Sequence, residues 1–87
     1  MNGIEKIVET WMISKNIFPF SILYSKDPQF LKISVFLKDD IQELLDLTNY
    51  KNMCDNSGVL VFNETNTLLF TGVSLINFLR HLDNSTF

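Results

Sequence analysis

The chain has 87 residues, 46% of them hydrophobic and 20% charged, which fits one small domain, residues 1–87, folded around a single core. Its formal net charge of −3 and its scattered lysines exclude the clustered basic surface that binding to nucleic acid or to an anionic membrane requires. No apolar run reaches the ~18 residues that span a membrane, and the acidic N-terminal segment does not resemble a signal peptide, so we expect a cytoplasmic protein.

The first predicted element is an amphipathic helix over residues 3–14. Apolar side chains recur there at helical spacing and share one face: Ile4, Ile7, Val8, Trp11 and Met12. Asn2 is the expected N-cap of this helix, and Lys15-Asn16 should end it.

Two strands follow and predict a β-hairpin. Residues 17–24 are rich in aromatic and β-branched side chains, and a period of two places on one face Phe18, Phe20, Ile22 and Tyr24. Because Pro19 has no backbone N–H to donate, we expect this strand at an edge of the sheet. Residues 25–28 form a turn signal. In residues 30–37, Lys32 and Ser34 alternate with an apolar set made of Leu31, Ile33, Val35 and Leu37.

The second half of the chain repeats this order of elements. Asp39 or Asp40 should open a second helix, and Asp39 with Gln42 resembles a capping box. After a polar loop at 49–57, residues 59–62 and 67–70 predict a second hairpin, and residues 73–82 predict a third helix. Its expected inward side chains are Val73, Ile76, Leu79 and Leu82. The predicted fold class is therefore α+β: a four-stranded, mostly antiparallel sheet with three helices in the order α-β-β-α-β-β-α.

The chain carries few residues for catalysis or metal binding. His81 is the only histidine, and it lacks a nucleophile or a set of metal ligands to act with, so a surface histidine near a helix end is the favoured interpretation. Cys54 is the only cysteine, and the neighbouring Asp55 disfavours a reactive thiolate. The acidic residues of the second helix match no calcium loop. We expect no catalytic residue, no metal and no cofactor.

The aromatic residues in the N-terminal half are more informative. One small core has little room for all of them, so some should face solvent or a partner. Either helices cover both faces of the sheet, or one face meets another molecule. The predicted protein-binding residues are Trp11, Phe18, Phe20, Tyr24 and Phe30, with Phe18 and Phe20 bordering a partner protein or a second copy of the chain.

The segments ISVFLKDDIQELLDL and SGVLVFNETNTLLFTGVSLINFLRHL follow a familiar order of elements within residues 33–82. They resemble half of a thioredoxin-like fold, in particular the N-terminal domain of glutathione transferases and of their non-catalytic relatives in tRNA-synthetase complexes. Phe78-Leu79 matches that family's helix end. Thr71-Gly72 stands where the family has Glu-Ser, and Gly58 stands where it has a cis-proline, so the resemblance implies no glutathione binding here. Thr71 is instead expected to cap the third helix.

These observations favour a non-catalytic protein–protein interaction domain that acts as an adaptor or assembly module. The alternative is a small regulator of the viral or phage type that inhibits a host enzyme or complex. Small size and acidic charge suit such an inhibitor. A degenerate thioredoxin-like enzyme is the third possibility, and it lacks the motif residues.

Overall fold

A computed structural model of the chain describes residues 3–47 and 59–84. Its elements are, in order, α1 (Gly3–Ser14), β1 (Pro19–Lys26), β2 (Gln29–Val35), α2 (Lys38–Leu47), β3 (Leu60–Phe62), the 3-10 turn η1 (Asn63–Thr65), β4 (Thr67–Thr71) and α4 (Val73–Asn84). Within these described ranges the predicted order α-β-β-α-β-β-α is confirmed. The expected N-cap Asn2, the loop 49–57 with Cys54, and Gly58 all lie outside the described residues.

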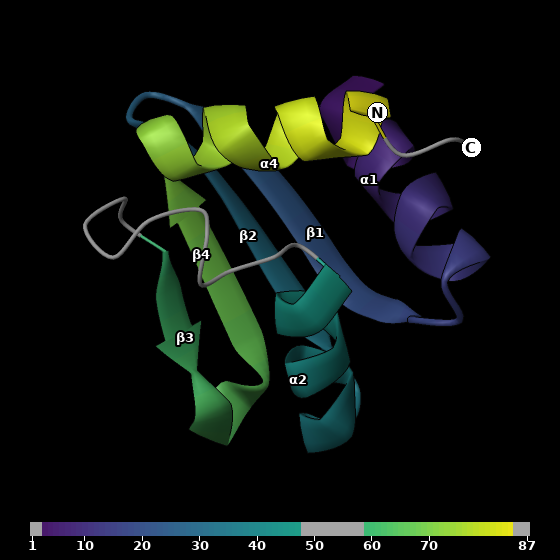
Figure 1. Cartoon of the computed structure of the whole chain (residues 1–87). Helices are drawn as coiled ribbons and strands as arrows, with labels where there is room; N and C mark the ends of the chain where they lie inside the picture. Colours follow the sequence, from purple (N-terminus) through teal and green to yellow (C-terminus); the bar gives the residue numbers. More distant parts are fainter. Residues whose placement is uncertain (1–2, 48–58, 85–87) are drawn as a thin grey trace.

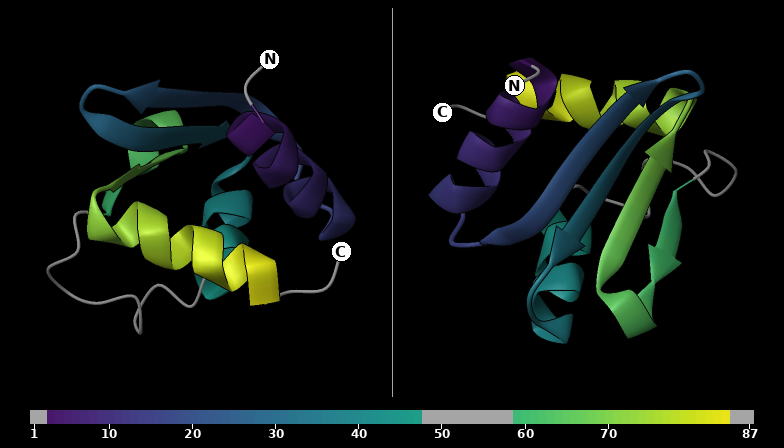
Figure 2. Two further views of the ribbon diagram at one scale, coloured as in Figure 1. Left: turned by 90° about the horizontal axis from the view of Figure 1, so that it is seen from above. Right: turned by 180° about the vertical axis from the view of Figure 1, so that it is seen from behind.

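The four strands form one sheet in the order β1-β2-β4-β3, and all three neighbouring pairs are antiparallel (Figure 1). β1 therefore lies at an edge, as Pro19 predicts. A thioredoxin-like sheet is mixed, and here each described strand pair is antiparallel. The three helices lie on one side of the sheet, and the view from behind shows the strands without a helix in front of β2, β4 and β3 (Figure 2).

The end of α1 is set by a left-handed residue. Asn16 has φ 64°, its N–H donates to the Ile13 carbonyl (3.0 Å), and the Ile17 N–H donates to the Met12 carbonyl (2.9 Å). This pattern is a Schellman motif with asparagine at the left-handed position. The buried side chains of Met12 and Ile17 flank it. The prediction that Lys15-Asn16 ends the helix is confirmed, whereas Ile7, expected in the core, is 49% exposed.

A bulge changes the predicted face of β1. The register between β1 and β2 shifts between Pro19 and Ser21, so the alternation expected from residue 18 onward is interrupted. Ile22 and Tyr24 pack against the core, and Phe20 projects into solvent. The prediction of one common face for Phe18, Phe20, Ile22 and Tyr24 is therefore wrong, because the extra residue at the bulge inverts the side on which the earlier side chains lie.

The start of α2 is capped by a different residue from the one predicted. The Asp40 carboxylate accepts a hydrogen bond from the Leu37 N–H (3.3 Å), and the Asp40 N–H donates to the Leu37 carbonyl (3.1 Å). The helix thus begins one residue before Asp39, and Asp40 occupies the third helical position, where a carboxylate reaches back to the cap. Gln42, the predicted partner of Asp39, instead donates to Asp46 (2.9 Å).

The inward face of α4 is rotated from the predicted one. Its buried side chains are Leu75, Phe78 and Leu82, whereas Val73 and Ile76 are exposed. Two overlapping apolar stripes share this helix, and the junction with β4 selects between them. Gly72 takes φ +53°, and the buried Ser74 hydroxyl accepts from the Thr71 N–H (3.0 Å) and donates to the Thr71 carbonyl (2.8 Å).

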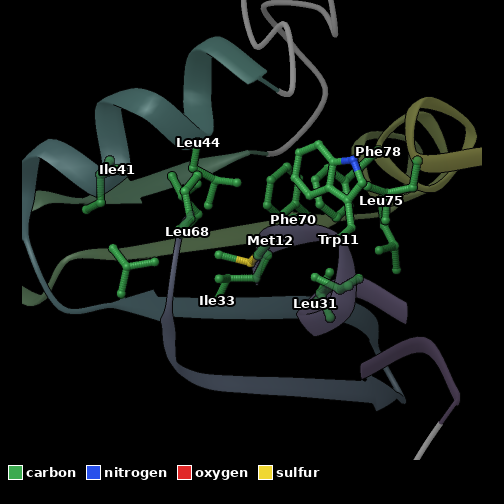
Figure 3. Packing of buried hydrophobic residues seen from close by; sticks show 14 residues of the cluster. Trp11, Met12, Leu31, Ile33, Ile41, Leu44, Leu68, Phe70, Leu75 and Phe78 are labelled. Atoms are coloured by element: carbon green, nitrogen blue, oxygen red, sulfur yellow. The ribbon is translucent and has the colours of Figure 1, made fainter. Parts of the chain in front are cut away.

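The core lies between the sheet and the three helices (Figure 3). Trp11 from α1 meets Phe78 from α4 edge to face, with ring centroids 5.9 Å apart, and Phe78 stacks on Phe70 from β4 at 4.5 Å. Such ring pairs add to the stabilisation that burial itself gives. Aliphatic side chains of β2, α2 and β4 complete the cluster, among them Leu31, Ile33, Leu44 and Leu68.

Candidate functional site: the helix-free face of the sheet

The candidate site is the face of the sheet opposite the helices. Strand residues that are direct partners in an antiparallel pair share a face, so the register fixes its composition. The central row runs across all four strands as Leu23, Lys32, Leu69 and Leu60. The next row is Ser21, Ser34, Thr67 and Phe62, and a third row contains Ser25, Phe30 and Thr71. We call this set of strand residues the open face.

Large apolar side chains on the open face remain accessible to solvent. Leu23 is 54% exposed, Leu60 is 50% exposed and Phe62 is 46% exposed, and Leu69 and Phe30 are half-buried. On the opposite side of the same strands, Leu31, Ile33, Leu68 and Phe70 are fully buried under the helices. Of the two arrangements that the aromatic content allowed, the described helices adopt the one that leaves one face of the sheet uncovered.

The polar residues of the open face include one charged side chain and a pair of hydroxyl groups on the two central strands. Ser34 and Thr67 lie side by side, with their hydroxyl oxygens 3.0 Å apart in a hydrogen bond, and the Thr67 hydroxyl also donates to the Thr65 carbonyl (2.9 Å). These hydroxyls are therefore satisfied within the protein. Lys32 is the one charged residue in the three rows, and within the described ranges no carboxylate forms an ion pair with it.

An aromatic pair extends the apolar surface at one end of the sheet. The rings of Phe20 and Phe36 meet edge to face with centroids 5.5 Å apart. Both rings stay mostly exposed, at 68% for Phe20 and 60% for Phe36. Phe36 follows β2 two residues after Ser34, so the alternation of the strand directs it to the same side as the open face. Its carbonyl is held in place by the Asn66 side-chain amide (2.9 Å).

The structure separates the predicted protein-binding residues. Phe20 and Phe30 border or belong to the open face, and Phe18 is exposed just before β1. Tyr24 lies on the helix-covered side and is half-buried, with its hydroxyl accepting from Gln29 (3.2 Å). Trp11 is only 1% exposed, so its inclusion is corrected: an indole enclosed by Phe78 and the rest of the core has no surface to offer a partner.

Sequence reasoning missed four apolar members of the open face: Leu23, Leu60, Phe62 and Leu69. The alternation in 30–37 contained the signal, since it assigned Lys32 to the side away from the core. What could not be read from the sequence is the pairing of β2 with β4, which aligns Lys32 with Leu69 and so carries the face into the second hairpin.

The described residues that were considered for chemistry do not form a metal site. His81 is half-buried on α4, and its ring meets that of Trp11 edge to face at 6.2 Å. Among residues 3–47 and 59–84, no group of three or more histidine, cysteine, aspartate or glutamate side chains could hold a metal ion. The same part of the chain contains no helix long and apolar enough to cross a membrane.

Comparison with known proteins gives no relative for this chain: no family model, no curated protein and no solved structure matches it.

Proposed function

We propose that the chain is a non-catalytic protein–protein interaction module that acts as an adaptor and binds through its open face. The observation that carries the proposal is the contrast between the two sides of one sheet. One side is buried under three helices, and the other keeps leucine and phenylalanine side chains in solvent. Exposed large apolar side chains that gather on one face of a small protein favour an interaction surface.

The resemblance to the non-catalytic relatives of glutathione transferases supports the same class of function, an adaptor without chemistry of its own. The antiparallel pairing of β1 with β2 differs from the mixed sheet of that fold. The proposal is therefore based on the open face and its side chains, and it assigns the chain no catalysis and no cofactor.

The test is partner capture with two matched double variants. Leu23→Ser, Leu60→Ser removes exposed leucines from the open face, and Ile13→Ser, Ile76→Ser removes isoleucines of similar exposure from the helical side. Both variants are checked for folding by circular dichroism. Each variant and the parent are then immobilised on a resin and incubated with a lysate of the cells that express the chain. We expect the leucine variant to lose captured protein at least tenfold and the isoleucine variant to retain it. Equal capture by both variants, or no capture by the parent, contradicts the proposal.

A second candidate function is the regulator that blocks an enzyme or complex of a host cell. The favouring observation is the exposed acidic side of α2, which carries Asp39, Glu43 and Asp46 and would suit a basic target surface. The same capture experiment separates the two functions. If the variant Asp39→Asn, Glu43→Gln loses the captured protein and the leucine variant keeps it, α2 is the binding element and the blocking function is favoured.

A further inference from the structure

We propose that the open face binds a single amphipathic helix of another protein and that an aspartate or glutamate on this helix pairs with Lys32. This inference rests on the proposed interaction function and specifies the kind of partner. It follows from the size of the face, from the charge at its centre and from the state of its hydroxyl groups.

The size of the open face fits one secondary-structure element. Four strands at a spacing of about 4.8 Å give a width of about 19 Å, and the five residues of β4 give a length of about 17 Å. This footprint, about 320 Å², is well below the roughly 800 Å² that each partner buries in a standard interface. A helix about 10–12 Å wide and three and a half turns long, about 19 Å, covers the central row and the inner part of the two flanking rows, so the face alone suits a helix better than a second folded domain.

The charge of the open face selects the chemistry of the partner. Lys32 lies between Leu23 and Leu69 in the central row, so any molecule that covers the leucines also covers the lysine. Burying an unpaired ammonium group costs several kcal/mol, whereas a facing carboxylate offsets much of that cost. The partner therefore needs a carboxylate within its apolar stripe.

A second copy of the chain does not meet this requirement. Two copies packed face to face about a two-fold axis would bring the same patch, with its lysine, against itself. The three rows of the open face contain no aspartate or glutamate to receive that lysine. Two lysines brought into one apolar contact repel each other and lose hydration, which disfavours self-association through this surface.

The two hydroxyl groups at the middle of the open face do not oppose burial. Because Ser34 and Thr67 bond to each other and the Thr67 hydroxyl donates to the Thr65 carbonyl, an apolar side chain can cover these two hydroxyls without leaving a donor unsatisfied. Ser21 and Ser25 lie on the edge strand, where water can still reach them. The Phe20–Phe36 pair adds apolar contact at the end of the sheet next to this row. Exposed aromatic rings beside a lysine also suit stacking with single-stranded nucleic acid, but the net charge of −3 opposes the approach of phosphates.

The inference is tested by zero-length cross-linking. A carbodiimide joins a lysine amine only to a carboxylate in direct contact with it. The chain, as a mixture of ¹⁴N and ¹⁵N protein, is incubated with the lysate of the expressing cells, cross-linked and digested for mass spectrometry. We expect a link from Lys32 to an aspartate or glutamate in a partner segment with apolar residues at i, i+3, i+4 and i+7.

Three variants serve as controls. Lys32→Arg keeps the charge without a reactive amine, so capture should persist while the cross-link disappears. Lys32→Glu should weaken capture at least tenfold, and Lys38→Glu, which makes the same change on exposed α2, should not. A cross-link of Lys32 to a second copy of the chain, capture that nuclease removes, or full capture by Lys32→Glu overturns this inference and leaves the adaptor function standing. Absence of capture by the parent overturns the adaptor function itself.

Discussion

At the scale of single residues, Asn16 shows how one backbone conformation ends a helix and starts a strand. Its φ of 64° lies in the left-handed region, which asparagine and glycine adopt at lower cost than other residues. The turn it makes places Ile17 in the core next to Met12, two residues before β1 begins at Pro19. Asn16 therefore links the position of α1 to the register of the edge strand.

This role predicts the effect of two substitutions at one position. Asn16→Ala should reduce the free energy of unfolding by about 1 kcal/mol, because alanine pays the steric penalty of the left-handed conformation. Asn16→Gly should have a free energy of unfolding within about 0.5 kcal/mol of that of the parent, since glycine adopts this conformation freely. Urea unfolding followed by circular dichroism measures both. Equal destabilisation by alanine and glycine would show that the asparagine side chain, and not the backbone conformation, matters.

At the scale of elements, the junction between β4 and α4 decides which side of α4 faces the core. The sequence predicted the helix and its approximate ends because apolar spacing is a local signal. It could not choose between the stripe containing Val73 and Ile76 and the stripe containing Leu75 and Phe78, because the choice depends on the turn at Gly72 and on the Ser74 hydroxyl. The β1 bulge misled the prediction for Phe20 in the same way. The sequence pattern also could not predict which distant strands pair, and the full composition of the open face depends on that pairing.

The rotation of α4 predicts a graded response along the helix. Phe78→Ala should cost about 3–5 kcal/mol, because Phe78 is fully buried between Trp11 and Phe70. Leu79→Ala should cost less, because Leu79 is half-buried at the border of the core, and Ile76→Ala should cost under about 1 kcal/mol. Urea unfolding of the three variants measures the order. A larger loss at Ile76 than at Phe78 would restore the helix face predicted from the sequence.

The Ser74 hydroxyl gives a separate prediction for the same junction. Ser74→Ala removes the group that bonds both the N–H and the carbonyl of Thr71, in a position with no exposure to solvent. We expect a loss of about 1–2 kcal/mol in the free energy of unfolding. Ser14→Ala is the matched control, because Ser14 is exposed at the end of α1 and water replaces its bond to the Trp11 carbonyl. If both variants lose the same amount, the buried hydroxyl does not hold the junction.

At the scale of the whole molecule, the sheet has one side that stabilises the fold and one side that contributes little to it. Burial of an apolar side chain stabilises in proportion to the area removed from water, about 25 cal/mol per Å². Leu23, Leu60 and Phe62 keep about half of their surface in water, whereas Leu31, Leu68 and Phe70 keep none. The exposed half of each open-face side chain contributes nothing to folding, which is the physical basis for the proposal that this face binds a partner.

This asymmetry predicts that the open face can be made polar without loss of the fold. In the variant Leu23→Thr, Leu60→Thr, Phe62→Thr, threonine keeps the β propensity of each strand position while removing most of the apolar surface. We expect cooperative thermal unfolding with a free energy within about 1.5 kcal/mol of the parent, together with higher solubility, because exposed apolar surface promotes association. The matched change Leu31→Thr, Leu68→Thr on the buried side should abolish cooperative unfolding, since it puts two hydroxyls and two cavities into the core. Loss of cooperative unfolding in the open-face variant would mean that these side chains are needed for folding, and the physical argument for a binding face would then fail.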